Sequence, residues 1–380
     1  MRVSTPIYMA AARAAARVLA APGVRSTFVR RSVAAGDALF PLSDLDIGLV
    51  VDGFDGAAMA GLLHRMRAAR GLIPRLGEAQ VTTADELRDL AECDPYRASI
   101  DRRTVVTVRG DAPVIPCQPL PPMAVARRLV FWLDHYMPWA VRRRRRRDQR
   151  KFTLEMWNAL GVLQGRWPEP HVSRRTVLLD WEASGCGDGA PPFVQCCRIA
   201  GQAHAWLGRS APRIERPVLV PGPRPIMLLP ACDSPWPAGA WRDEARVLTP
   251  PALDLLMAAQ DPFLWLDARG PLQALGFSAP GRGAWLAACA RHTSTERLRR
   301  PGFIERGPVL QARRLARVEA VLAWVEGGQT GAPAEPPPDR AAPASVPAYY
   351  RAHFDQLLSE AARLRRRVRA LAAQQTPADC

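Results

Sequence analysis

Residues 31–51 read RSVAAGDALFPLSDLDIGLVV, and this stretch decides the fold of the N-terminal part of the chain. It begins with small residues that end at Gly36, continues through a loop, and closes with the apolar run 45–51, which is typical of a buried strand. Asp44 and Asp46 lie two residues apart where that strand begins. Because side chains alternate across a strand, both carboxylates are expected on one face.

The two carboxylates predict a metal site. Like charges side by side repel unless a cation lies between them, and oxygen ligands favour a hard ion such as Mg²⁺ or Mn²⁺. Ser32 and Gly36 lie upstream in a turn of small residues, where backbone amides and one hydroxyl are suited to phosphate oxygens. The alternative interpretation is a pair of solvated acids that cap a turn.

The flanking sequence predicts a small mixed sheet followed by helices. Apolar patterning and caps indicate helices over 5–21, 56–70 and 85–92 and strands over 26–34, 45–51, 79–83 and 103–109. Beyond Pro119, apolar spacings of three and four predict helices over 122–140 and 148–164. The expected fold class is α+β, with a small mixed-sheet domain and then a mostly α-helical domain.

The expected organisation has five parts. Residues 1–118 are the mixed-sheet domain, 119–210 a helical domain, and 211–326 a proline-rich and then helical region. Residues 327–347 have the composition of a low-complexity linker. The charged helix predicted over 348–373 is a candidate coiled-coil or docking segment, through which the chain would form an oligomer.

The motif in residues 31–51 resembles that of the DNA polymerase beta-like nucleotidyltransferase superfamily, in its small bacterial form. That pattern is Gly-Ser, a short turn ending in Gly, a loop, and Ser-Asp-x-Asp leading into an apolar strand. Ser32, Gly36, Ser43, Asp44 and Asp46 match it, and the resemblance covers roughly residues 24–110. It implies a metal-dependent enzyme that binds a nucleoside triphosphate through these residues. Such an enzyme moves a nucleoside monophosphate, most often AMP, to a hydroxyl of a small molecule, a protein or an RNA end, and releases pyrophosphate.

Two positions depart from the family pattern. Arg31 stands where the family has its first glycine, and Gln80 stands where a third carboxylate is expected on the strand near 79–83. Glu78 is the nearest acid and shares a face with Gln80 in strand alternation, so it is our candidate third catalytic carboxylate. Asp101 is the substitute. These departures also leave open a weakened domain that binds or regulates without turnover.

The charge of the chain favours a phosphate-bearing partner. The formal net charge is +16, but the basic residues are nearly all arginine in an Ala-, Pro- and Gly-rich chain, which is also the composition of a GC-rich genome. Lys151 is the only lysine, which indicates either a site that needs a compact ammonium or chance survival of one lysine codon. The family resemblance implies the first, with Lys151 at the triphosphate, because a lysine of the helical domain often lies there in that family. The arginine run 142–147 leaves nucleic-acid binding as a rival function.

The sequence predicts a cytoplasmic chain with no membrane span. No run of 18 apolar residues occurs, and Arg13 and Arg17 interrupt the apolar N-terminal stretch that a signal peptide needs. The eight cysteines form no CxxC pair, which argues against a zinc site.

Overall fold

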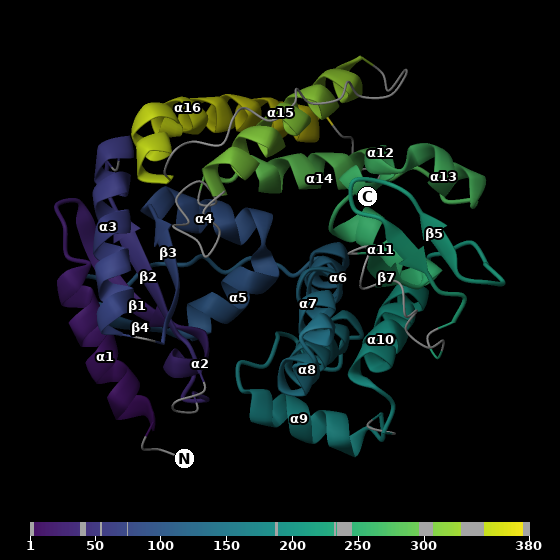
Figure 1. Cartoon of the computed structure of the whole chain (residues 1–380), viewed down its shortest axis with the longest axis horizontal. Helices are drawn as coiled ribbons and strands as arrows, with labels where there is room; N and C mark the ends of the chain where they lie inside the picture. Colours follow the sequence, from purple (N-terminus) through teal and green to yellow (C-terminus); the bar gives the residue numbers. More distant parts are fainter. Residues whose placement is uncertain are drawn as a thin grey trace. The chain divides into compact units, whose positions relative to one another are not determined.

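The computed structural model describes residues 4–38, 43–53, 55–73, 75–186, 189–231, 233, 245–295, 307–327 and 346–374. The fold is α+β, as predicted, with a mixed sheet and many helices (Figure 1). The chain forms two compact units, and each is described by itself. Unit 1 comprises Met1–Gln118 together with Cys289–Cys380, and unit 2 comprises Pro119–Ala288.

Unit 1 is built on a four-stranded sheet in the order β3-β2-β1-β4. Its strands are β1 (Val24–Arg30), β2 (Leu45–Val51), β3 (Leu76–Thr82) and β4 (Val105–Arg109). β1 runs antiparallel to β2 and β4, whereas β2 and β3 are parallel. β2 is an inner strand, and its apolar run is buried, which explains why its predicted bounds agree with the structure.

Helices cover both faces of this sheet (Figure 1). α1 (Ser4–Val18) and α3 (Gly56–Leu72) lie on one side, and α4 (Ala84–Cys93) and α5 (Pro95–Arg103) lie on the other. On the α4 side, Phe28 and Val50 of the sheet pack with Leu87 of α4 and Ala98 of α5. α4 begins with a capping box between Thr83 and Glu86, which satisfies two backbone amides that the first turn would otherwise leave unpaired.

The C-terminal helices also belong to unit 1. α15 (Gly307–Glu326) contacts α16 (Val346–Ala373), and α16 packs along α3. Charged pairs reinforce the packing, with Arg367 on Glu319 and Glu326 of α15 and Arg369 on Glu92 of α4. α16 buries its apolar side within its own chain through Tyr350, Phe354, Leu357, Ala361, Leu364, Val368 and Leu371. The oligomer contact expected of helix 348–373 stays a prediction, and residues 328–345 of the expected linker lie outside the described part.

Unit 2 is mostly helical. Its helices are α6 (Pro122–Phe131), α7 (Met137–Arg142), α8 (Arg146–Leu163), α9 (Arg174–Ala183), α10 (Pro192–Trp206), α11 (Pro250–Ala259), α12 (Phe263–Asp267) and α13 (Arg269–Ala274), and α14 (Arg282–His292) crosses the boundary between the units. The proline-rich segment contributes to a small sheet of β5 (Val218–Val220), β6 (Ile226–Leu228) and β7 (Arg246–Leu248).

The helix expected over 122–140 is interrupted by a π-helical segment, Trp132–Tyr136. Asp134 of this segment is buried and paired with Arg246 of β7. Burial alone would raise the pKa of Asp134, but the Arg246 guanidinium and the His135 ring hold it far below its usual range. The π-helical turn therefore fixes α6 to the small sheet.

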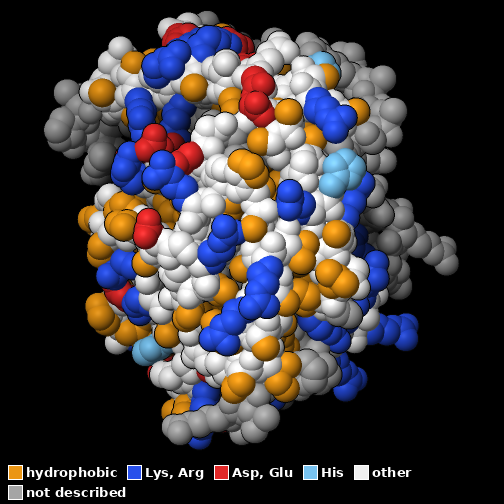
Figure 2. Space-filling view, turned by 90° about the vertical axis from the view of Figure 1, so that its left-hand side faces the viewer, with side chains coloured by type: hydrophobic (Ala, Val, Ile, Leu, Met, Phe, Trp, Pro, Cys, Tyr) orange, Lys and Arg blue, Asp and Glu red, His pale blue; other side chains and the backbone are white. Residues whose placement is uncertain are grey.

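Among the described helices, none combines the length and the apolar character that crossing a bilayer requires. Figure 2 shows basic side chains spread over the visible face among hydrophobic, uncharged and acidic ones.

Candidate functional site

The turn after β1 contains two residues with positive φ angles, Arg31 and Gly36. The strand expected over 26–34 ends at Arg30, and α2 (Arg31–Ala34) follows as a short helix. Arg31 has φ +57°, in the left-handed region that glycine adopts more readily than residues with a side chain. Gly36 closes the turn with φ +75°. The position at which the family pattern places its first glycine is therefore a position where the backbone favours glycine.

Asp44 and Asp46 approach one point beside β3. A Cβ atom added to Gly77 would lie 2.9 Å from Asp44 Cβ and 2.9 Å from Asp46 Oδ1, so both acids lie next to Gly77. Asp44 makes this approach with its Cβ atom and Asp46 with a carboxylate oxygen, and the shared face of the two carboxylates stays a prediction. Asp46 is mostly covered, with a side chain that is 17% exposed, whereas Asp44 is 65% exposed. No signal in the sequence indicates that Gly77, which directly precedes Glu78, lies beside the two acids.

α1 fixes the segment that leads into Asp44. The Tyr8 hydroxyl donates a hydrogen bond to the Ser43 carbonyl oxygen at 2.5 Å, and Tyr8 is only 2% exposed. This bond joins the N-terminal helix to the residue that precedes the acid pair. No local pattern in the sequence connects Tyr8 with Ser43, which lies 35 positions away.

β3 carries an irregularity beside the acids. Leu45 pairs with Leu76 and Ile47 with Ala79, so Gly77 and Glu78 together stand opposite Asp46. Such a bulge turns side chains out of simple alternation. The Arg70 guanidinium donates to the Gly77 carbonyl oxygen at 3.3 Å and supports the bulge. The backbone places Glu78 at the level of Asp46, but its side chain lies outside the described part, so its catalytic role stays a prediction.

Arginines lie close to both acids. Arg31 Nη1 is 3.9 Å from Asp46 Oδ2, and Arg75 Nη1 is 3.9 Å from Asp44 Oδ1. Both distances exceed the range of about 2.7–2.9 Å for a charge-assisted hydrogen bond. The Arg75 pair is exposed on both sides, and such pairs contribute on the order of 0–1 kcal/mol. The weak Arg75–Asp44 pair would therefore cost little to replace with a ligand.

Gln80 belongs to a buried polar network. Arg97 of α5 donates from Nη2 to Gln80 Oε1 at 2.9 Å and from Nε to Asp101 Oδ2 at 3.3 Å. Arg30 of β1 binds the same carboxylate oxygen. Burial would raise the pKa of Asp101, but Arg30, Arg97 and Arg31 together hold it below its usual value. Gln80 and Asp101 are therefore engaged with buried arginines, which the sequence did not reveal.

Lys151 and the arginine run lie in unit 2. Lys151 is on α8, with Nζ 5.8 Å from the centre of the Phe152 ring. Residues 142–147 span the end of α7 and the start of α8. The predicted contacts of Lys151 and of the arginine run with phosphate stay predictions.

Asp44 and Asp46 fit a metal that is shared with a phosphate ligand. Within the described ranges, no group of three or more His, Cys, Asp and Glu side chains is arranged around a metal position. Magnesium, however, is commonly held by one or two carboxylates together with waters and substrate phosphates. The acids at Gly77 and the arginines around them complement a ligand that carries both a cation and phosphate charge.

No protein-family model matches the chain, and no curated protein matches it.

Proposed function

We propose that unit 1 is a metal-dependent nucleotidyltransferase, which moves a nucleoside monophosphate, with AMP the first candidate, to a hydroxyl acceptor and releases pyrophosphate. The observation that carries the proposal is the meeting of Asp44 and Asp46 at Gly77. The left-handed turn that begins at Arg31 supports it, because the family motif places a glycine there.

Each residue would have a distinct task. Magnesium or manganese bound by Asp44 and Asp46 would neutralise charge on the triphosphate and on the leaving pyrophosphate. The Ser32 hydroxyl and the turn that ends at Gly36 would bind phosphate oxygens. Tyr8 would keep Ser43, and with it Asp44, in place. Glu78 would serve as a further ligand or as the base for the acceptor hydroxyl.

Transfer of label from α-³²P nucleoside triphosphates tests the reaction directly. The intact protein would be incubated with magnesium, each of the four triphosphates, and acceptors of three kinds: small alcohols, the protein itself and RNA ends. Labelled product and equimolar pyrophosphate are expected with at least one acceptor, and Asp46→Asn should abolish both.

The matched control is Asp52→Asn, which removes the acid at the other end of β2, where Asp52 pairs with Arg25. This variant should retain activity. Transfer that persists in Asp46→Asn would contradict the metal role. A complete absence of transfer would contradict the enzyme.

A second candidate is a module that binds nucleotide without turnover. It is favoured by the engagement of Gln80 with Arg97 at the position where the family has an acid. It predicts saturable, magnesium-dependent triphosphate binding that is lost in Asp46→Asn, together with no transfer to any acceptor. Labelled product in the assay above would exclude it.

A further inference from the structure

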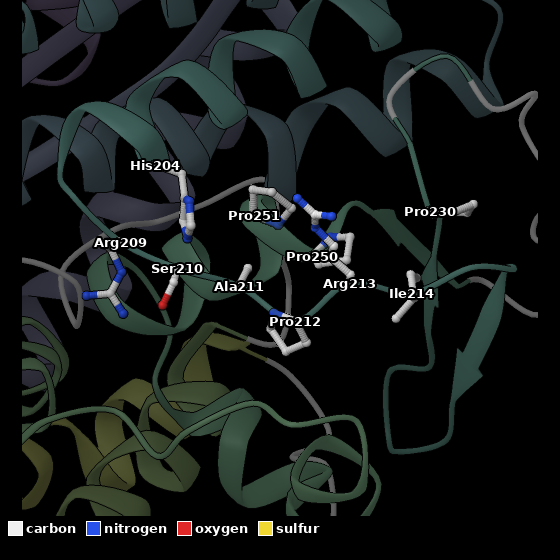
Figure 3. A pocket seen from close by; sticks show the side chains of 10 residues that line it. All are labelled: His204, Arg209, Ser210, Ala211, Pro212, Arg213, Ile214, Pro230, Pro250 and Pro251. Carbon is white, nitrogen blue, oxygen red and sulfur yellow. The ribbon is translucent and has the colours of Figure 1, made fainter.

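A cavity of about 480 Å³ lies within unit 2, and none of the residues of the proposed nucleotide site lines it. It lies where α10 ends, along the segment 209–214, and at the start of α11 (Figure 3). Its volume is within the range of about 300–1,000 Å³ that is usual for small-molecule sites. All the residues that line it belong to unit 2, so the cavity is defined within one unit.

One wall carries a histidine in a fixed orientation. His204 of α10 is 5% exposed, and its Nε2 lies 3.0 Å from Asp254 Oδ2 of α11. Arg209 donates to both oxygens of the same carboxylate, at 2.7 and 3.3 Å. Burial would raise the pKa of Asp254, but hydrogen bonds from His204 and Arg209 hold it below its usual value. Asp254 is therefore an ionised acceptor, and His204 Nε2 donates to it.

This arrangement leaves one ring atom for a ligand. With Nε2 committed to Asp254, Nδ1 is the remaining polar atom of the His204 ring, and it has no hydrogen-bond partner among the described residues. His204 itself lines the cavity. Its position is supported from behind by a charged pair, as is usual where a side chain must be held for binding.

A second cation lies at the cavity without a compensating acid. Figure 3 shows the Arg213 guanidinium group beside Pro250 and Pro251. In the described part of the chain, Arg213 makes no ion pair, and no Asp or Glu lines the cavity. Among the described residues that line the cavity, Arg209 is matched by Asp254, and Arg213 adds a further positive charge.

The remaining walls are apolar and stiff. They are formed by Ala211, Pro212, Ile214, Pro230, Pro250 and Pro251. Four of these six residues are prolines, whose φ angle is fixed. The wall therefore loses little conformational entropy when a ligand binds. Ser210 turns its hydroxyl away from His204 in Figure 3, and no hydrogen bond joins the two. The geometry thus suits binding and offers no activated serine.

We infer that this cavity is a binding site for a small organic anion with a flat or cyclic apolar body. The proline walls would contact the body. Arg213 would bind the carboxylate or phosphate group, and His204 Nδ1 would hydrogen-bond a polar substituent. Neither the nucleotide site nor its chemistry is needed for this inference.

Isothermal titration calorimetry with the full chain tests it, using phenyl phosphate and benzoate as probes. At least one of these probes should bind with one-to-one stoichiometry. The probe that binds more tightly shows whether the site prefers a phosphate or a carboxylate group. Arg213→Gln should weaken binding at least about tenfold, the usual result of losing one charge-assisted hydrogen bond. Arg216→Gln is the matched control, because Arg216 is an exposed arginine of the same segment that does not line the cavity.

A filling variant provides an independent test. Ala211→Leu places three more carbon atoms in the cavity and should abolish binding, with an unchanged melting temperature as the check on folding. The inference is overturned if neither probe binds, or if inorganic phosphate binds as tightly as phenyl phosphate. The inference is also overturned if phenol binds as tightly as phenyl phosphate. The same holds if Arg213→Gln and Arg216→Gln weaken binding equally.

Discussion

The left-handed conformation of Arg31 predicts an unusual order of stability for two substitutions. Arg31→Ala and Arg31→Gly both remove the guanidinium group, so the 3.9 Å pair with Asp46 is lost equally in each. They differ in the backbone alone. A left-handed conformation costs a residue with a Cβ atom about 1–2 kcal/mol, and glycine avoids this. Glycine in turn costs about 0.5–1 kcal/mol through the freedom that it loses on folding.

The difference between these terms spans about 0–1.5 kcal/mol, and its centre makes Arg31→Gly more stable than Arg31→Ala by about 0.75 kcal/mol. For a domain of this size, that corresponds to a difference in Tm of roughly 1–4 °C. Differential scanning calorimetry of both variants measures it. The control is Ala34→Gly in the same short helix, where φ is not positive and glycine should lower stability by about 0.5–1 kcal/mol. If Arg31→Ala is as stable as Arg31→Gly, the backbone at residue 31 is not left-handed.

Three further predictions follow from particular contacts. Gly77→Ala should weaken magnesium-dependent nucleotide binding at least about tenfold in calorimetric titrations, because the added Cβ atom would collide with Asp44 and Asp46. The control is Gly71→Ala on α3, where an added Cβ atom meets nothing within 4 Å, and this variant should bind as the parent does. Asp101→Asn should lower stability by about 3–5 kcal/mol at neutral pH, because it removes the buried negative charge that Arg30 and Arg97 both contact. The pKa of Asp101 is lower in the folded protein than in the unfolded chain. The stabilisation by the Asp101 carboxylate is therefore present above the unfolded pKa of about 3.9 and is lost as the pH falls below that value. The urea midpoints of the parent and of Asp101→Asn should converge at acid pH. Lys151→Arg should weaken nucleotide binding about tenfold if the ammonium contacts phosphate. Equal nucleotide affinities of the parent, Lys151→Arg and Lys151→Ala would exclude that contact.

Local patterns predicted much of the secondary structure of unit 1. The strand expected over 45–51 agrees with β2, because a buried inner strand is apolar along its length. The strand expected over 26–34 extends too far, since β1 ends where Arg31 enters the left-handed region. Backbone conformation of this kind is not encoded by hydrophobic spacing. The interruption of helix 122–140 by a π-helical turn was missed for the same reason.

The site was predictable where it depends on nearby residues. Asp44 and Asp46 are two residues apart in the sequence, and both have an atom beside Gly77. The contact of Tyr8 with Ser43 joins distant segments, and so does the bond between Arg97 and Gln80. Such contacts are set by tertiary packing, so spacing in the sequence does not reveal them. The packing of α16 on α3 is a further example, because the sequence indicates only that the helix is charged.

Magnesium-dependent binding of a non-hydrolysable ATP analogue tests the central claim most directly. Calorimetric titrations at fixed salt would compare the parent protein with Asp44→Asn, Asp46→Asn and the control Asp52→Asn, and melting temperatures would confirm that all four are folded. Binding should require magnesium and should weaken at least about tenfold in the first two variants, because each removes one charged ligand from a site that needs both. Asp52→Asn should bind as the parent does. Equal affinity in all four proteins, or binding that is indifferent to magnesium, would contradict the assignment of Asp44 and Asp46 to a metal–nucleotide site.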